Sequence, residues 1–416
     1  MQIDKDGFFH LTYCTKIHPC HGWEDLFASI MGYVPALKAR LAPDSPFGLG
    51  LRLSATESLE LLDGDNLRIF KEFLSLQDIY VFTVNGFPYG PFRRQSVKAS
   101  VFSPDWRENN RVAYTERLIE ILAALLPPGM EGSISTLPLS YKPWIAPNDI
   151  RSMEQIITNL AHIVGLLILV REEQGTFIHL DLEPEPDGLL ENSNEVVDFF
   201  QHWLLPYGGP ILAGWIGTSL ARAQALLLDH IRICLDTCHL AVAYEDFASV
   251  LDLFEAHGIK VGKVQITSGL KVWLPEAPEQ RRVLGRQLEL FSQSPYLHQV
   301  IARRDGGTFC HYQDLSEILP QFSTVADSQW RIHFHMPLYV DGYEGLSSTQ
   351  EETRAMLQLL KERRVCRHLE LETYTWEVLP SAMQVDILDC LEKEYLWTLQ
   401  VLDLEEELPA AISLAS

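Results

Sequence analysis

Four short segments place a residue type that binds divalent metals directly after an apolar run. They are DLEPEP with Glu183, CLDTCH with Asp236 and His239, KVQITS with Gln265, and LELETYTW with Glu372. Carboxylates that meet at one point repel each other unless a cation lies between them. Two carboxylates with imidazole or amide ligands suit Mn²⁺, Zn²⁺, Co²⁺ or Mg²⁺. The joint pattern therefore predicts a divalent metal site, although each side chain alone is more simply explained as solvated or ion-paired.

The segment CLDTCH is the most specific of the four. An apolar strand delivers Asp236, and His239 follows where the strand opens into a helix. In a metal site the aspartate is an oxygen ligand and the histidine is a ligand or a substrate contact. The alternative is that Asp236 only caps the next helix. A zinc pair of Cys234 and Cys238 is disfavoured, because alternation puts Cys234 inside the strand and no second cysteine pair is near.

Nine apolar runs alternate with amphipathic segments, which predicts a parallel sheet with helical crossovers. The runs begin at Phe8, Phe47, Tyr80, Gly132, Phe177, Ile231, Lys260, Trp330 and His368. Predicted helices include 111–126, 150–170, 195–204, 244–256, 349–361 and 381–402. Eight strands complete a (β/α)8 TIM barrel, so one of the nine predicted strands is expected to lie outside the barrel. The region 298–338 is the best candidate, with a hairpin around Asp305, Gly306 and Gly307 inserted before the last barrel strand.

Polar and apolar side chains alternate within several of these strands. In FIHLDLEP the apolar residues 178, 180 and 182 share one face, while His179, Asp181 and Glu183 share the other. Apolar outer faces and polar inner faces suit a barrel better than an open sheet buried on both sides. The polar residues gather toward the carboxyl ends of the strands, where barrel active sites lie. In the absence of a linker-like segment, we expect one domain over 1–405 and a loose acidic tail at 406–416.

Charge, cysteine content and the absence of certain motifs disfavour several classes of protein. The 416 residues include 33 basic and 56 acidic ones, and the net charge of −23 disfavours a nucleic-acid partner. Seven cysteines predict reduced thiols, and the first residues show no secretion signal. The most apolar stretch, 163–170, is about two helical turns long and predicts no membrane span. We therefore expect a cytoplasmic protein. GxSxG, GxGxxG and GKS/T motifs are absent, so triad hydrolase, Rossmann and P-loop functions have no support.

The order of LEPEP, CLDTCH, KVQITS and LELETYTW resembles that of the xylose isomerase-like TIM barrels, which include sugar isomerases, sugar 3-epimerases and endonuclease IV. HLTYCTKIHP, FGLGLRLS, VFTVNGFPYG, DLEPEPDG, CLDTCHLAV and RIHFHMPLYV more closely resemble the EboE branch, over nearly the whole chain up to about residue 377. That branch belongs to the Ebo gene cluster, which is linked to the traffic of secondary metabolites toward the cell envelope. The resemblance implies a small polar metabolite as ligand and other Ebo-cluster proteins as partners.

The resemblance also implies roles for particular residues. It makes Glu183, Asp236 and Glu372 metal ligands, with Glu183 and Glu372 also moving a proton of a sugar-like substrate. The metal histidine of the epimerases falls at Gln265, which is a weaker ligand, and His335 in RIHFHMP is the candidate to supply the missing imidazole. Expected substrate contacts are His239, His18, Arg52, Asn85 and Tyr374.

Two classes of function remain open on these grounds. One is a metal-dependent isomerase or epimerase of a small polar metabolite. The other is a non-catalytic trafficking component that has kept the barrel and modified its site. An endonuclease IV-like phosphodiesterase is disfavoured, because the extra zinc histidines of that enzyme fall near Asn85 and Thr136, which are poor zinc ligands.

Overall fold

The computed structural model describes residues 1–90, 98–292, 296–304 and 306–404. At its centre eight parallel strands pair in the order β1-β14-β7-β6-β5-β4-β3-β2. A parallel bridge between Cys14 and Gly50 brings the two end strands together. This arrangement confirms the predicted (β/α)8 TIM barrel. The strands are β1 (His10–Tyr13), β2 (Phe47–Arg52), β3 (Ile79–Asn85), β4 (Gly132–Thr136), β5 (Ile178–Leu182), β6 (Ile231–Asp236), β7 (Val261–Ile266) and β14 (His368–Leu371).

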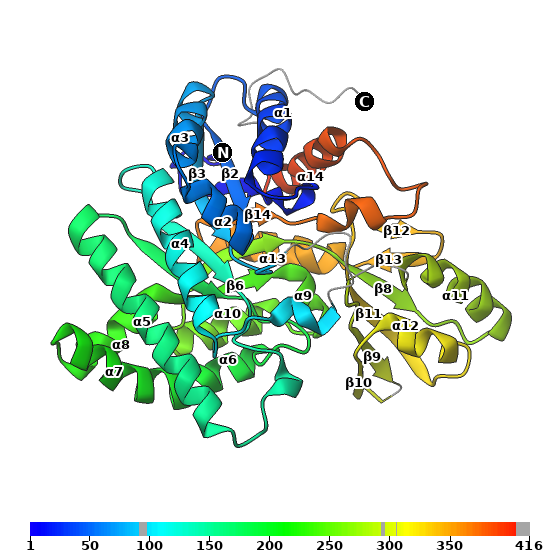
Figure 1. The fold of residues 1–416 in the computed structure, drawn as a ribbon. Coiled ribbons are helices and arrows are strands. Elements are labelled where there is room, and N and C mark those ends of the chain that lie inside the picture. The colour runs from blue at the N-terminus through cyan, green and yellow to red at the C-terminus, as the bar shows by residue number, and fades with distance from the viewer. Residues whose placement is uncertain (91–97, 293–295, 305, 405–416) are drawn as a thin grey trace.

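Helices surround the barrel (Figure 1). Several begin at a side chain that accepts a hydrogen bond from the first turn, as Asp149, Ser219 and Asp246 do, and Ser54 forms a capping box with Glu57. The helices of this layer are α1 (Trp23–Leu41), α2 (Ala55–Leu62), α3 (Asn66–Leu76), α4 (Asn109–Leu125), α5 (Ile150–Gln174), α6 (Ser193–Phe199), η4 (Phe200–Gly208), α7 (Gly209–Ile216), α8 (Leu220–His230), α9 (Thr237–Val242), α10 (Phe247–Ala256), α13 (Gln350–Arg363) and α14 (Ile387–Val401). Shorter turns are η1 (Thr15–Ile17), η2 (Lys98–Phe102), η3 (Lys142–Trp144) and η6 (Tyr374–Val378).

Helix α5 is longer than the sequence pattern suggested. By length and composition it could cross a membrane, and α6 to α8 would count as a second such segment only if their 107° bend were ignored. In the structure 56% of its most apolar window is buried. Ile157, Leu160 and Val164 are fully buried and belong to the core between the sheet and the outer helices.

The insertion before β14 is a six-stranded sheet, larger than the predicted hairpin. It stands at one side of the barrel (Figure 1) and has its own apolar core, with Leu288, Trp330 and Phe334 among its fully buried members. Its strands pair in the order β10-β9-β11-β8-β13-β12. Their bounds are β8 (Gly269–Trp273), β9 (Val300–Arg304), β10 (Phe309–Tyr312), β11 (Asp327–His335), β12 (Gly342–Tyr343) and β13 (Leu346–Ser348), with α11 (Pro278–Ser292), α12 (Leu315–Ile318) and η5 (Leu319–Gln321).

Two sequence predictions concern this insertion. The run from Trp330 is the one outside the barrel and forms β11, and the predicted hairpin exists as the antiparallel pair β9 and β10. Residue 305 at its turn and the predicted tail at 406–416 lie outside the described residues. The insertion also leaves and re-enters the barrel at one place, because the Gly269 amide donates to Thr349 Oγ1 (2.7 Å) and the Thr349 amide donates to the Gly269 carbonyl (2.8 Å).

The inner face of the barrel is polar and closed to solvent. Lys263 on β7 and Glu370 on β14 form an ion pair of 2.5 Å, and neither side chain is exposed. Glu370 fits only because residue 50 is glycine, since a Cβ there would lie 2.2 Å from Glu370 Oε1. The carboxylate of Asp181 meets His179 Nδ1 at 2.6 Å. The predicted alternation, with polar side chains facing the barrel interior, therefore holds for β5, β7 and β14.

Buried histidines make the stability of the fold depend on pH. Burial lowers the pKa of His10 to about 4, and burial also lowers the pKa of His230 to about 4. Between pH 6.5 and 4 the unfolded chain therefore binds more protons, and each histidine lowers stability by about 1.4 kcal/mol per pH unit as the pH falls. We expect His10→Gln to weaken this pH dependence in urea unfolding between pH 7 and 4.5. The same change at His202, which is exposed, should leave the slope as it is.

Candidate metal centre

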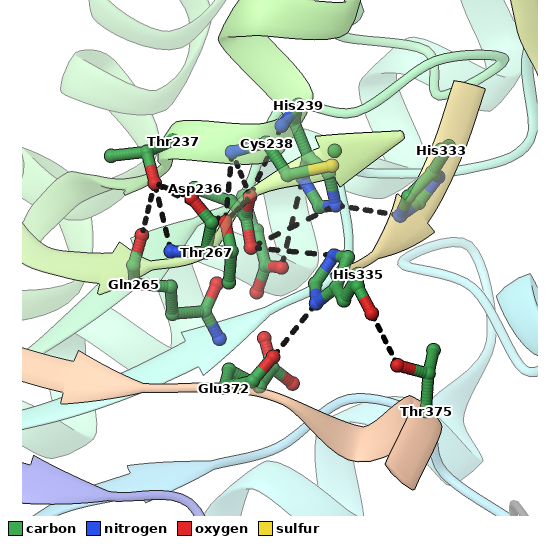
Figure 2. Close-up of polar contacts among 12 residues, drawn as sticks. Asp236, Thr237, Cys238, His239, Gln265, Thr267, His333, His335, Glu372 and Thr375 are labelled. Carbon is green, nitrogen blue, oxygen red and sulfur yellow. Dashed lines mark hydrogen bonds and ion pairs between the residues drawn. The ribbon is translucent and has the colours of Figure 1, made fainter. Parts of the chain in front are cut away.

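Histidine and carboxylate side chains from the barrel and from the insertion meet at the carboxyl end of the barrel. Glu183 follows β5, Asp236 ends β6 and His239 lies in α9. The insertion contributes His333 and His335, which alternation places on one face of β11. Three overlapping groups have ligand atoms within 4.8 Å of one another: His239 with His333 and His335, Asp236 with Cys238 and His335, and Glu183 with Asp236 and His239. Figure 2 shows His333 and His335 facing Asp236 and His239.

Asp236 performs two tasks with its two oxygens. Oδ1 accepts the amides of Cys238 (2.7 Å) and His239 (3.0 Å) and the hydroxyl of Thr267 (2.5 Å), so it caps α9. For Oδ2 the described residues offer no hydrogen-bond partner, although the atom is buried. It lies 3.9 Å from Nε2 of His239 and 3.9 Å from Nε2 of His335. The two interpretations of CLDTCH, cap or ligand, are therefore compatible in one side chain.

Each of the three histidines has its Nδ1 next to an oxygen acceptor. His239 Nδ1 lies 3.1 Å from the Pro184 carbonyl, His335 Nδ1 lies 2.7 Å from the Glu372 carbonyl, and His333 Nδ1 lies 2.9 Å from Gln299 Oε1. An Nδ1 that donates to oxygen leaves Nε2 with a lone pair, which is how metal-binding histidines are held. The Nε2 atoms of His239 and His333 are only 3.0 Å apart.

Burial changes the pKa values of His239 and His333 and of the neighbouring carboxyl groups. It lowers the pKa of His239 and, helped by the neighbouring His239 and His335, holds the pKa of His333 well below its usual value. Burial and the nearby Glu372 and Asp236 raise the pKa of Glu183 well above its usual value. For Asp236 burial acts in the same direction, but the adjacent His239 and His335 outweigh it and lower its pKa. Neutral imidazoles and crowded carboxyl groups are an environment that a cation stabilises.

Glu372 has a different partner from the one that the sequence suggested. Lys16 in η1 places Nζ 2.7 Å from Glu372 Oε1 and 4.3 Å from the centre of the Tyr374 ring. Asn85 Nδ2 donates to the same Oε1 at 3.2 Å. Among the described residues Glu372 is not a member of the three metal-ligand groups. Glu372 was expected to be a metal ligand, but in the structure it forms an ion pair with Lys16. No sequence pattern had indicated a role for Lys16.

The other predicted site residues lie at different places. Gln265 accepts a hydrogen bond from the Cys234 thiol (3.3 Å), beneath the cluster. Arg52 contacts Glu57 and the carbonyls of Pro88 and Gly90. His18 bonds to Tyr13 (2.8 Å) and stacks on Tyr33 of α1. Their proposed substrate and metal roles stay predictions.

The cluster opens into a small cavity at the barrel mouth. About 40 Å³ of room is lined by Glu183, Glu185, His239, His333, His335, Glu372, Lys16 and Gln299, with Tyr374, Phe87 and Phe102 among the aromatic residues of its wall. Tyr374 and Glu372 were expected here, whereas Lys16 and Gln299 were not. The space suits an ion with a small polar group better than a large apolar cargo.

Several solved structures resemble the whole chain at low identity. One is the IolI protein with a bound zinc atom (TM-score 0.45, 10% identity, covering 95% of this chain and 98% of that one). A second is the probable 3-DHS dehydratase AsbF of Bacillus anthracis, involved in petrobactin synthesis (0.43, 11%, 94% and 98%). A third is a xylose isomerase domain protein from Planctomyces limnophilus (0.46, 10%, 95% and 98%).

No protein-family model matches the chain, and no curated protein matches it. The structural neighbours are xylose isomerase-like TIM barrels, but likenesses of this extent carry no argument about a reaction. The finer resemblance to the EboE branch stays a prediction. The barrel itself is shown by its own eight parallel strands.

Proposed function

We propose that the protein is a metal-dependent enzyme of the isomerase or epimerase class that acts on a small polar metabolite. The observation that carries the proposal is the convergence of three imidazoles with Asp236 Oδ2 in a buried space, with Glu183 Oε1 3.9 Å from Nδ1 of His239. Two atoms bound to one ion at roughly 2.0–2.2 Å lie about 3–3.5 Å apart. The separations of 3.0 and 3.9 Å around His239 are close to that range.

The donor set favours a transition metal. Imidazole suits Zn²⁺, Co²⁺, Mn²⁺ or Fe²⁺, whereas Mg²⁺ prefers oxygen ligands and retains its water. Asp236, His239, His333 and His335 would hold the ion, with Glu183 beside them. Gln265 and Glu372 are then not needed as ligands, and the insertion supplies the imidazole that β7 lacks.

A bound ion of this kind would polarise a carbonyl or hydroxyl oxygen of the substrate. Glu372 then moves the proton. Its contacts with Lys16 and Asn85 both involve Oε1, which leaves Oε2 to take a proton from the carbon beside the carbonyl. Delivery of a different proton to the other face of that carbon by Glu183, the second carboxyl group of the cavity, would be an epimerisation. Return of the proton by Glu372 to the neighbouring carbon, while the hydroxyl proton passes to the carbonyl oxygen, would be an isomerisation. The sequence resemblance supports a role with the other proteins of an Ebo-type gene cluster. Composition supports a cytoplasmic location.

The proposal predicts that Glu372→Gln separates metal binding from proton transfer. Wild-type protein dialysed against Co²⁺ or Zn²⁺ should retain one ion per chain by elemental analysis, and the variant should retain as much. Only the wild type should exchange the carbon-bound proton of small hydroxy-aldehydes and hydroxy-ketones in D₂O, followed by NMR. Absence of bound metal in the wild type would refute the metal centre. Undiminished exchange in the variant would refute the role of Glu372.

A further inference from the structure

Gln299 joins the insertion to the barrel beside His333. It precedes β9, is 2% exposed, and its backbone carbonyl accepts the amide of His333 at 2.9 Å. Oε1 lies 2.9 Å from Nδ1 of His333, and Nε2 donates to the Pro186 carbonyl of the segment after β5 at 3.0 Å.

The orientation of this amide follows from its partners. A proline carbonyl can only accept, so the amide nitrogen of Gln299 must face Pro186 and the amide oxygen must face His333. An oxygen at Nδ1 requires that Nδ1 carry the hydrogen. Nε2 of His333 is therefore left with its lone pair, directed at Nε2 of His239.

His239 is held in the same tautomer by a backbone carbonyl, that of Pro184. Two buried lone pairs 3.0 Å apart repel each other unless a cation lies nearby. A metal ion satisfies both lone pairs.

From this geometry we infer that Gln299 is the positioning residue that makes His333 a metal ligand. The inference rests on the proposed function. Of the three Nδ1 acceptors it is the one provided by a side chain, since His239 and His335 use the backbone of Pro184 and Glu372. Substitution of Gln299 can therefore change the hydrogen bond that orients a proposed ligand without removing that ligand.

Three variants test the inference with Co²⁺ as the probe. Gln299→Met removes the acceptor and should weaken Co²⁺ binding by roughly 10- to 100-fold. Gln299→Glu keeps an acceptor at Nδ1 and, as the protonated acid, a donor to the Pro186 carbonyl, and it should stay within a few-fold of the wild type. His333→Ala should change the visible spectrum of bound Co²⁺ in the same way as Gln299→Met. Combining the two should cost no more than His333→Ala alone, because both act through one ligand.

A control separates this effect from a general loss of structure. Gln224 on α8 also donates to a backbone carbonyl, that of Leu205, and it belongs neither to the cavity lining nor to the ligand groups. Gln224→Met should leave Co²⁺ binding unchanged. Wild-type affinity in Gln299→Met, or additive losses in the double variant, would overturn the inference while the metal centre stands. A wild-type protein that binds no Co²⁺ would overturn the proposed function first, and this inference with it.

Discussion

Asp236→Asn is expected to lower the affinity for Co²⁺ or Zn²⁺ by roughly 100-fold or more, beyond the loss typical of a contact that only orients a ligand. The asparagine oxygen can still accept the amides of Cys238 and His239 and so keep the cap of α9. Its nitrogen, a donor without a lone pair, then replaces Oδ2 between His239 and His335. Isothermal titration of metal-free protein measures the loss.

The matched control is Asp246→Asn. Asp246 caps α10 by accepting the Ser249 amide at 2.9 Å, is exposed, and belongs neither to the cavity lining nor to the ligand groups. Both variants should unfold at similar urea concentrations in the presence of a chelator. If Asp236→Asn binds metal as tightly as the wild type, Oδ2 is not a ligand and the aspartate is only a cap.

Lys263→Met is expected to destabilise the barrel by about 3–5 kcal/mol, the cost of leaving one member of a buried ion pair without its partner. Glu370 would keep a carboxylate in an interior with no exposed surface, next to Gly50 and without Nζ at 2.5 Å. Burial already raises the pKa of Glu370 although Lys263 opposes it, so loss of the lysine favours the protonated acid further. Equilibrium unfolding in urea gives the change in free energy.

The double variant Lys263→Met with Glu370→Leu should recover most of that loss, because two apolar groups can replace a buried pair without a large penalty. An exposed pair provides the comparison. Arg68 and Glu72 lie 2.7 Å apart on α3 with more than half of each side chain exposed, so Arg68→Met should cost less than about 1 kcal/mol. Equal costs for Lys263→Met and Arg68→Met would mean that the barrel interior is hydrated and polar enough to screen the charge.

The barrel and part of its site could be predicted from sequence because local patterns determine them. Alternation assigns Asp181 and Glu183 to the inner face of β5, and parallel strands bring Glu183 and Asp236 to the same end. His335 was also expected, as a substitute for the imidazole missing at Gln265. The same alternation places His333 beside it and could have identified this third candidate nitrogen ligand.

Lys16 and Gln299 could not be identified in this way. Lys16 lies in a single turn after β1, and Glu372 is 356 residues away in the chain, so no periodicity links them. The role of Gln299 depends on how the insertion folds back over the segment after β5. The size of that insertion was underestimated because β12 and β13 have only two and three residues, too few to show a pattern.

The hydrogen bonds between Gly269 and Thr349 hold the two ends of the insertion side by side. Residues 270–348 could be exchanged for a short linker without separating β7 from α13. Such an excision would remove both His333 and His335, whereas Asp236 and Glu183 would remain in the barrel. The donor set of the proposed metal centre can therefore be changed within the insertion, while the parallel barrel that carries Asp236 and Glu183 keeps its strands.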